Sequence, residues 1–148
     1  MGNDRRLKVI GVGSPFSDDT LGWQLLDTLA EQGLELPGWR ITYKKADRPG
    51  PGLLEYLKDT DAAVLIDAMR ADDPSGNVRL VEPAQLLSHA SPTSSHAMGV
   101  AESLALGEQL HMLPPMLHIL GIQVGAQPGP AAVEQARAVI VELFSPAT

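Results

Sequence analysis

The sequence contains no cysteine, and this absence removes several classes of chemistry. A disulfide, a thiol nucleophile and a zinc or iron–sulfur site built on the chain's own thiolates are all excluded. Any metal that the chain binds must therefore be held by histidine nitrogens and carboxylate oxygens, which suit borderline and hard ions. Such a site would be drawn from the four histidines and eighteen acidic residues of the sequence.

Basic residues are also scarce, because eleven Lys and Arg face eighteen Asp and Glu and give a net charge of −7. Nucleic acids and anionic membranes are bound largely through Lys and Arg contacts to phosphate, so neither is expected as a partner. No apolar run approaches the roughly 20 residues that cross a bilayer. Residues 1–8 are too polar and charged for a signal peptide, and a cytoplasmic protein is expected.

A length of 148 residues suits a single domain over residues 1–148 that is large enough to bury a core. Apolar residues follow strand-like and helix-like periodicities in alternation. The predicted strands are residues 7–11, 39–44, 62–68, 77–81 (an edge strand) and 116–124, and the predicted helices are residues 20–32, 53–58, 96–110 and 131–144. This alternation predicts an α/β fold, a three-layer sandwich in which helices cover both faces of a mostly parallel twisted sheet. The proline- and glycine-rich residues 47–52 (DRPGPG) predict a loop.

Three polar residues fall where the carboxyl ends of parallel strands should meet, which is where such sheets place their functional groups. Asp19 follows the loop after the first strand, and Asp67 lies near the end of the most apolar strand. His96 follows a polar loop and precedes a helix. Two carboxylates and one imidazole offer the oxygen and nitrogen ligands of a divalent metal site.

Each of these residues also has a simpler interpretation. Asp19 has the position and chemistry of a helix cap, and His96 has those of a surface or capping histidine. Asp67 is harder to explain in this way, because a buried unpaired carboxylate is costly, and its simpler interpretation is a cap or turn contact at the strand end. His118, inside an apolar strand, is expected to be a core histidine bonded to backbone. The combination of the three residues favours a metal site more than any one of them does.

Two other catalytic or cofactor motifs are incomplete. Gly11-Val12-Gly13 follows the first strand as a dinucleotide fingerprint would, but Phe16 occupies the place of the third glycine. A tight strand-to-loop turn is therefore favoured, and no nucleotide cofactor is expected. A Ser14–His96–Asp67 triad can be drawn, but the segment GVGSPF lacks the last glycine of a nucleophile elbow, and its proline would disturb that turn.

Three motifs, taken in order, resemble those of the hydrogenase maturation proteases, the endopeptidases that trim the large subunit of nickel–iron hydrogenases. They are residues 11–22 (GVGSPFSDDTLG), 64–69 (VLIDAM) and 94–100 (SSHAMGV), and the later LHILGIQV is similar to the last core strand of the family. The resemblance spans nearly the whole chain. It implies that Asp19, Asp67 and His96 are the metal ligands and the catalytic residues. The metal would be nickel carried by the substrate, although another divalent metal also fits.

The same resemblance implies a partner, which is the precursor large subunit of a nickel–iron hydrogenase, cut at its C-terminal extension by a monomeric protease. The sequence departs from the family pattern at three places. Asp19 stands where the family usually has Glu, and Ser14 stands where it usually has Asn. Residues 47–50 (DRPG) replace a D-G-G-T segment. These departures leave open a non-catalytic module that only binds metal or docks the precursor, as a metallochaperone does.

Overall fold

The computed structural model describes residues 4–13, 20–47, 52–82 and 100–145. In chain order, the elements of these ranges are β1 (Arg5–Gly13), α1 (Leu21–Gln32), β2 (Trp39–Asp47), α2 (Leu53–Tyr56), β3 (Ala62–Met69), β4 (Val78–Leu80), α3 (Val100–Gln109), β5 (Met116–Gln123) and α4 (Pro130–Phe144). Strands and helices alternate along most of the chain, as the periodicities predict.

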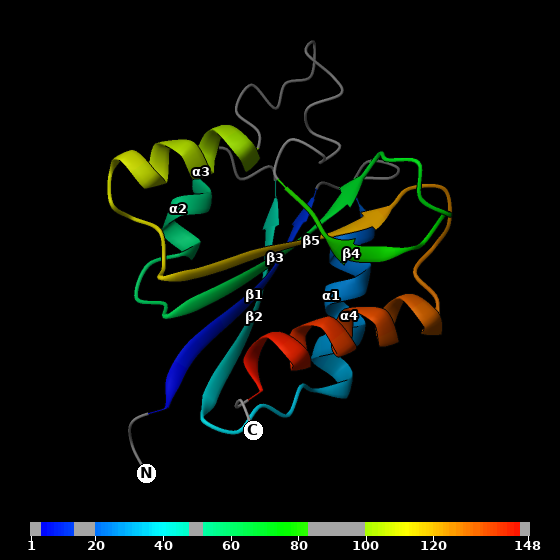
Figure 1. The fold of residues 1–148 in the computed structure, drawn as a ribbon, viewed down its shortest axis with the longest axis horizontal. Helices are drawn as coiled ribbons and strands as arrows, with labels where there is room; N and C mark the ends of the chain where they lie inside the picture. Colours follow the sequence, from blue (N-terminus) through cyan, green and yellow to red (C-terminus); the bar gives the residue numbers. More distant parts are fainter. Residues whose placement is uncertain (1–3, 14–19, 48–51, 83–99, 146–148) are drawn as a thin grey trace.

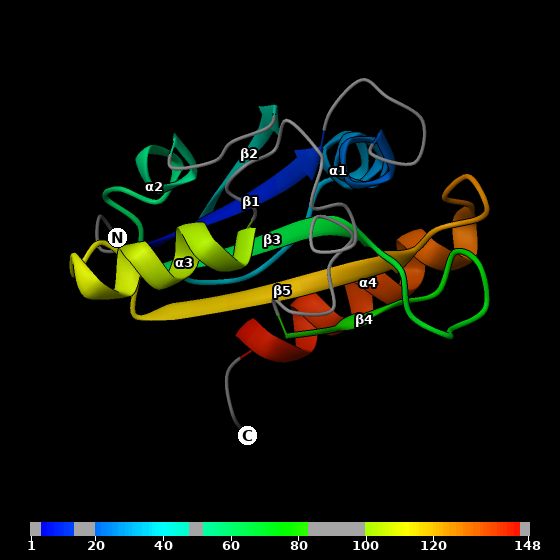
Figure 2. The same ribbon diagram turned by 90° about the horizontal axis from the view of Figure 1, so that it is seen from above.

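The strands form one sheet in the order β2-β1-β3-β5-β4 (Figure 2). The pairs β1–β2, β1–β3 and β3–β5 are parallel, and only β4 runs antiparallel, against β5. Helices α1 and α4 cover one face of the sheet, and α2 and α3 cover the other (Figure 1). The predicted three-layer α/β sandwich with a mostly parallel sheet is confirmed.

The position of each strand follows from its sequence. All eight residues of β3 are buried, because a continuous apolar run suits a strand that is paired on both sides and covered on both faces. β2 forms one edge of the sheet, and only its residues Trp39 and Ala46 are buried. β4 forms the other edge and is shorter than the predicted residues 77–81. The sequence pattern does not predict that β4 runs antiparallel to β5.

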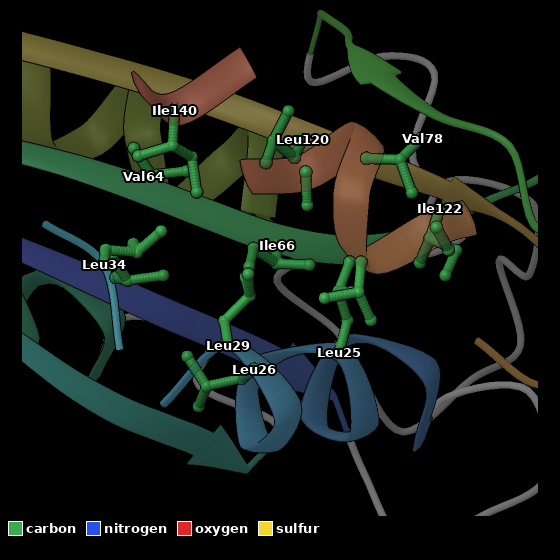
Figure 3. Close-up of a cluster of buried hydrophobic side chains, with 14 of the residues drawn as sticks. Leu25, Leu26, Leu29, Leu34, Val64, Ile66, Val78, Leu120, Ile122 and Ile140 are labelled. Carbon is green, nitrogen blue, oxygen red and sulfur yellow. The ribbon is translucent and has the colours of Figure 1, made fainter. Parts of the chain in front are cut away.

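Alternate residues of β3 divide the core into two clusters. Val64 and Ile66 point towards the first cluster, which lies between the sheet and helices α1 and α4 (Figure 3). Leu65 and Met69 belong to the second cluster, which lies between the sheet and helices α2 and α3. Both clusters are continuous along the strands, so the two helical layers are fixed to one rigid sheet.

Helix α1 approaches the sheet closely because two glycines meet at the contact. A Cβ on Gly22 would lie 2.6 Å from the carbonyl oxygens of both Val12 and Ile66. A Cβ on Gly11 would lie 2.8 Å from the carbonyl oxygen of Gly22. The first turn of α1 therefore rests on the backbone at the carboxyl ends of β1 and β3, and a larger residue at either position would push the helix away.

The other end of the sheet, where β1 and β3 begin, is held by hydrogen bonds that involve charged residues. The backbone N–H of Arg6 donates to Asp61 Oδ2 at 2.7 Å, and the N–H of Asp61 donates back to the Arg6 carbonyl at 3.0 Å. Lys8 Nζ donates to the carbonyls of Tyr56 and Lys58, at the end of the short helix α2. These bonds connect β1 to the start of β3 and to the layer above it.

Several predicted boundaries change in detail. Thr20 occupies the N-cap position of α1 but makes no capping bond, and its hydroxyl accepts instead from Gln24 Nε2 at 2.7 Å. Gly33 ends α1 with φ of 76°, directly after the predicted helix over residues 20–32. Asp47, expected in a loop, is the last residue of β2. The helix expected over residues 96–110 is described from Val100 onwards as α3.

None of the helices in the described ranges combines the length and the apolar character that crossing a bilayer requires.

The glycine contact of α1 makes a prediction about stability. We expect Gly22→Ala to lower the free energy of unfolding by about 1–3 kcal/mol, because its methyl group overlaps two backbone oxygens that cannot rotate away. Urea unfolding followed by circular dichroism measures the change. Gly52→Ala is the control, since Gly52 has φ of −63° and no described atom lies within 4 Å of the place that its Cβ would take. Equal midpoints for the two variants would contradict the proposed role of the contact.

Candidate active site

Asp67 is the predicted site residue that the structure describes, and it lies two residues before the carboxyl end of β3. Its side chain is 7% exposed, and its Oδ1 accepts from the backbone N–H of Ala68 at 2.8 Å. Strand alternation places it on the same face as Leu65 and Met69, beneath the layer of α2 and α3. An ionised carboxylate in an otherwise apolar strand is expensive to bury, so the position is specified by more than strand packing.

Asp19 and His96 lie outside the described residues, as does Ser14, so their contacts with Asp67 stay predictions. The elements that follow them are placed. Gly22, in the first turn of α1, packs on the carbonyl of Ile66, the residue before Asp67. This contact brings the start of α1 to the strand end that carries the carboxylate.

Helix α3 begins on the other face of the sheet. Val100, the first residue of α3, is buried in the cluster that contains Val12 and Leu65. This is the face on which the Asp67 side chain lies. Asp47, the last residue of β2, pairs with Gly13 at the same carboxyl edge. The start of α1, Asp67 and Asp47 therefore lie at the carboxyl end of the sheet, and α3 begins on the face that carries Asp67.

A second buried polar residue at this edge was not singled out from the sequence. Gln123 ends β5, is 6% exposed, and accepts at Oε1 from the backbone N–H of Ala71 at 3.0 Å. The only signal was a single amide residue inside the apolar run LHILGIQV. Sequence alone gives no reason to separate such a residue from an ordinary strand-end glutamine.

The segment between β3 and β4, at the same edge, is held by a polar network. Arg79 donates to both carboxylate oxygens of Asp73, from Nε at 2.7 Å and from Nη2 at 3.0 Å, and Asn77 Nδ2 donates to Asp73 Oδ2 at 2.7 Å. Gln135 of α4 accepts from the N–H of Val78 and donates to Asn77 Oδ1. These bonds attach the segment to both β4 and α4.

The charged hydrogen bonds of the network change the ionisation of its members. The Arg79 guanidinium, followed by the Asn77 amide, holds the pKa of the Asp73 carboxyl below its usual value. The same pairing raises the pKa of Arg79. The network is therefore an ionic clamp at neutral pH.

A groove of about 820 Å³ runs between α3 and the sheet on the face that carries Asp67. Its lining residues are Leu80, Val81, Glu82, Ala101, Leu104, Ala105, Glu108, Leu113, Leu117, His118 and Ile119. His118 is half-buried rather than a fully buried core residue, and its ring packs edge-on against Phe144 with the centroids 5.9 Å apart. The predicted backbone bond of this ring does not occur within the described part of the chain.

The donor set predicted for a metal has two carboxylates and one imidazole, which suits a borderline divalent ion such as nickel or zinc. The described residues contain no group of three or more His, Asp or Glu side chains that are arranged to hold an ion. Asp67 fits such a site by its chemistry and its burial, while the other two donors belong to residues that are not described.

A comparison with family models places the chain. The model described as hydrogenase maturation protease matches residues 49–142, well over half of the sequence. The chain belongs to the hydrogenase maturation protease family. The match includes Asp67 and His96, and Asp19 lies before it. Membership supports a role for this hydrogenase maturation protease as an endopeptidase, and thus a hydrolase, in hydrogenase maturation.

Solved structures share the fold. The hydrogenase maturating endopeptidase HybD from E. coli superposes with a TM-score of 0.68 and 22% identity, over 93% of this chain and 91% of that chain. The [NiFe] hydrogenase maturation protease HycI from Thermococcus kodakarensis KOD1 gives 0.56 and 18%, over 97% and 94%. The search of curated proteins gives no match. At these identities the structural likeness shows the same α/β architecture.

The ionic clamp at Asp73 makes a prediction about pH. Because the pKa of Asp73 is lowered by folding, its contribution to stability is present above the usual value of 3.8 and is lost as the pH falls through the folded pKa. We expect Asp73→Asn to be less stable than the wild type at pH 6, with the difference shrinking below about pH 4. Urea titrations between pH 3 and pH 6 measure this difference.

The control is Asp72→Asn, which removes the same charge from an exposed neighbour that forms no bond with the described residues. A stability difference for Asp73→Asn that does not depend on pH would contradict the ionic clamp.

Proposed function

We propose that this hydrogenase maturation protease removes a C-terminal extension from the precursor large subunit of a nickel–iron hydrogenase, and that Asp19, Asp67 and His96 recognise nickel carried by that precursor. The observation that carries the proposal is Asp67, a buried carboxylate at the carboxyl end of the central strand of a family member. In this proposal the protein acts as a monomer in the cytoplasm on this one protein substrate.

The chemistry required is the hydrolysis of one peptide bond. A water molecule adds to the carbonyl carbon, the C–N bond breaks, and a proton that leaves the water ends on the departing nitrogen. The Asp67 carboxylate is suited to accept and return that proton, because the Ala68 N–H orients it and burial shields it from bulk water. His96 and Asp19 are the groups that we expect beside it.

Two arrangements differ in which molecule owns the metal ion. In the first, open coordination positions of the site accept nickel already inserted in the precursor, which orients the scissile peptide. The thiolates around that nickel then come from the client, which suits a protease without cysteine. In the second, the protein holds its own divalent ion, which when bound polarises the carbonyl or activates water. We favour the first arrangement.

Asp67→Asn tests the site. The amide oxygen still accepts from Ala68, so the fold should persist, but the lost base should slow precursor trimming by about 10³-fold. Trimming is measured as loss of the C-terminal extension by mass spectrometry of the purified precursor. Asp61→Asn is the matched control, because Asp61 precedes the same strand at its opposite end and keeps an acceptor oxygen for Arg6.

His96→Ala belongs in the same assay, and we expect it to abolish trimming. If trimming survives both the Asp67 and the His96 changes, the proposed site is wrong. A wild-type chain that binds the precursor without trimming it would instead support the non-catalytic docking module, the alternative that Asp19 in place of Glu leaves open.

The ownership of the metal has its own experiment, in which nickel-loaded and nickel-free precursors are each mixed with metal-free and metal-loaded protein. We expect metal-free protein to cut only the nickel-loaded precursor. Metal content is measured by plasma mass spectrometry before mixing. Cleavage of nickel-free precursor by metal-loaded protein would exclude recognition of the client's nickel and favour a resident ion.

A further inference from the structure

Within the described residues, the Oε1 of Gln123 has a hydrogen-bond partner and its Nε2 has none. Its Oε1 accepts from the N–H of Ala71 at 3.0 Å, which fixes the orientation of the amide. The side chain is 6% exposed, and no residue in the described ranges accepts a hydrogen bond from its Nε2. An amide donor that is buried without a partner costs about 1–3 kcal/mol. An acceptor for this donor must therefore come from outside the described residues.

Gln123 shares a face with Asp67. In the parallel pairing of β3 with β5, Asp67 lies opposite Gly121, and Met69 lies opposite Gln123. Side chains two residues apart on a strand point to the same face, so Gln123 lies one strand across and two residues beyond Asp67, about 8 Å between Cα atoms. Both polar residues stand at the carboxyl edge, on the face covered by α2 and α3.

The apolar side chain of Met69 lies beside these two polar residues. A Cβ on Gly121 would lie 2.7 Å from Met69 Sδ, so the Met69 side chain lies over Gly121 where another residue would project. Met69 is fully buried and offers no strong hydrogen-bonding group. A polar substrate atom beside Met69 would therefore find its donor in Gln123 and its carboxylate in Asp67.

We propose that Gln123 Nε2 donates a hydrogen bond to the carbonyl oxygen of the scissile peptide bond and stabilises the negative charge that develops there. This inference rests on the proposed function. As water adds to the carbonyl carbon, the electron pair of the C=O bond moves to the oxygen, which Gln123 holds until the C–N bond breaks. The amide itself gains and loses no proton. Because Ala71 already fixes the amide, no reorganisation is needed at that moment.

Gln123→Glu is the informative variant, since it has the same shape and still accepts from Ala71 but loses both Nε2 donors. We expect kcat for precursor trimming to fall about 10²–10³-fold, with KM changed less than about threefold, as for the loss of an oxyanion donor. Gln135→Glu is the matched control. Gln135 likewise accepts from a backbone N–H, that of Val78, and the exposed change should leave both constants near wild type.

Gln123→Met covers the case in which a buried glutamate prevents folding, because it removes the donor without adding charge. A kcat near wild type in a folded Gln123→Met or Gln123→Glu variant would overturn the inference, as would a rise in KM alone. Loss of kcat in the Met variant with retention in the Glu variant would also overturn it, since only the bond to Ala71 would then matter.

Wild type and Asp67→Asn are measured in the same assay. A wild type that does not trim the precursor contradicts the proposed function itself. A wild type that trims, an Asp67 variant that does not, and a Gln123→Glu variant that matches the wild type contradict only the role of Gln123.

Discussion

The close contact of α1 with the sheet at Gly11 and Gly22 is the constraint on which the site geometry depends. Without side chains at either position, the first helical turn rests directly on the backbone of β1 and β3. This fixes where the chain re-enters the fold after the first loop, one residue position away from Asp67 on β3. Gly11 belongs to the Gly-Val-Gly segment that resembles part of a dinucleotide fingerprint. In the structure this glycine allows the close packing of α1 on the sheet.

The two faces of the sheet differ in the side chains that they present at the carboxyl ends of the central strands. Towards α1 and α4 the central strands present only apolar side chains at their carboxyl ends, such as Ile66 and Ile122. Towards α2 and α3 the same strand ends present Asp67 and Gln123. A carboxylate and an amide in nearly dry surroundings interact with a bound peptide more strongly than they would in water, because few solvent dipoles screen them. The polar residues of the candidate site therefore lie on one face of the sheet, the face covered by α2 and α3.

Sequence periodicity predicts most of the fold, because the periodicity follows from which residues are buried. The observed bounds of α4 and β5 lie within one or two residues of the expected bounds. The direction of β4 is not predictable in this way, since three residues carry no signal of orientation. Asp67 stands out because a charge inside an apolar run is costly. Gln123 does not stand out in the sequence, because its hydrogen bond with Ala71 depends on the fold and not on neighbouring residues in the chain. Asp19 and His96 remain predictions from motif and order.

The reciprocal hydrogen bonds between Arg6 and Asp61 lie at the amino ends of β1 and β3. At the usual rise per strand residue, this is about 20 Å along β3 from Asp67. They determine which residue of β3 faces which residue of β1. A slip of one residue would turn every β3 side chain to the opposite face, and Asp67 would then point into the apolar layer beneath α1. Strand register at one end of the sheet therefore decides whether Asp67, at the other end, faces the layer of α2 and α3 or the apolar layer beneath α1 and α4.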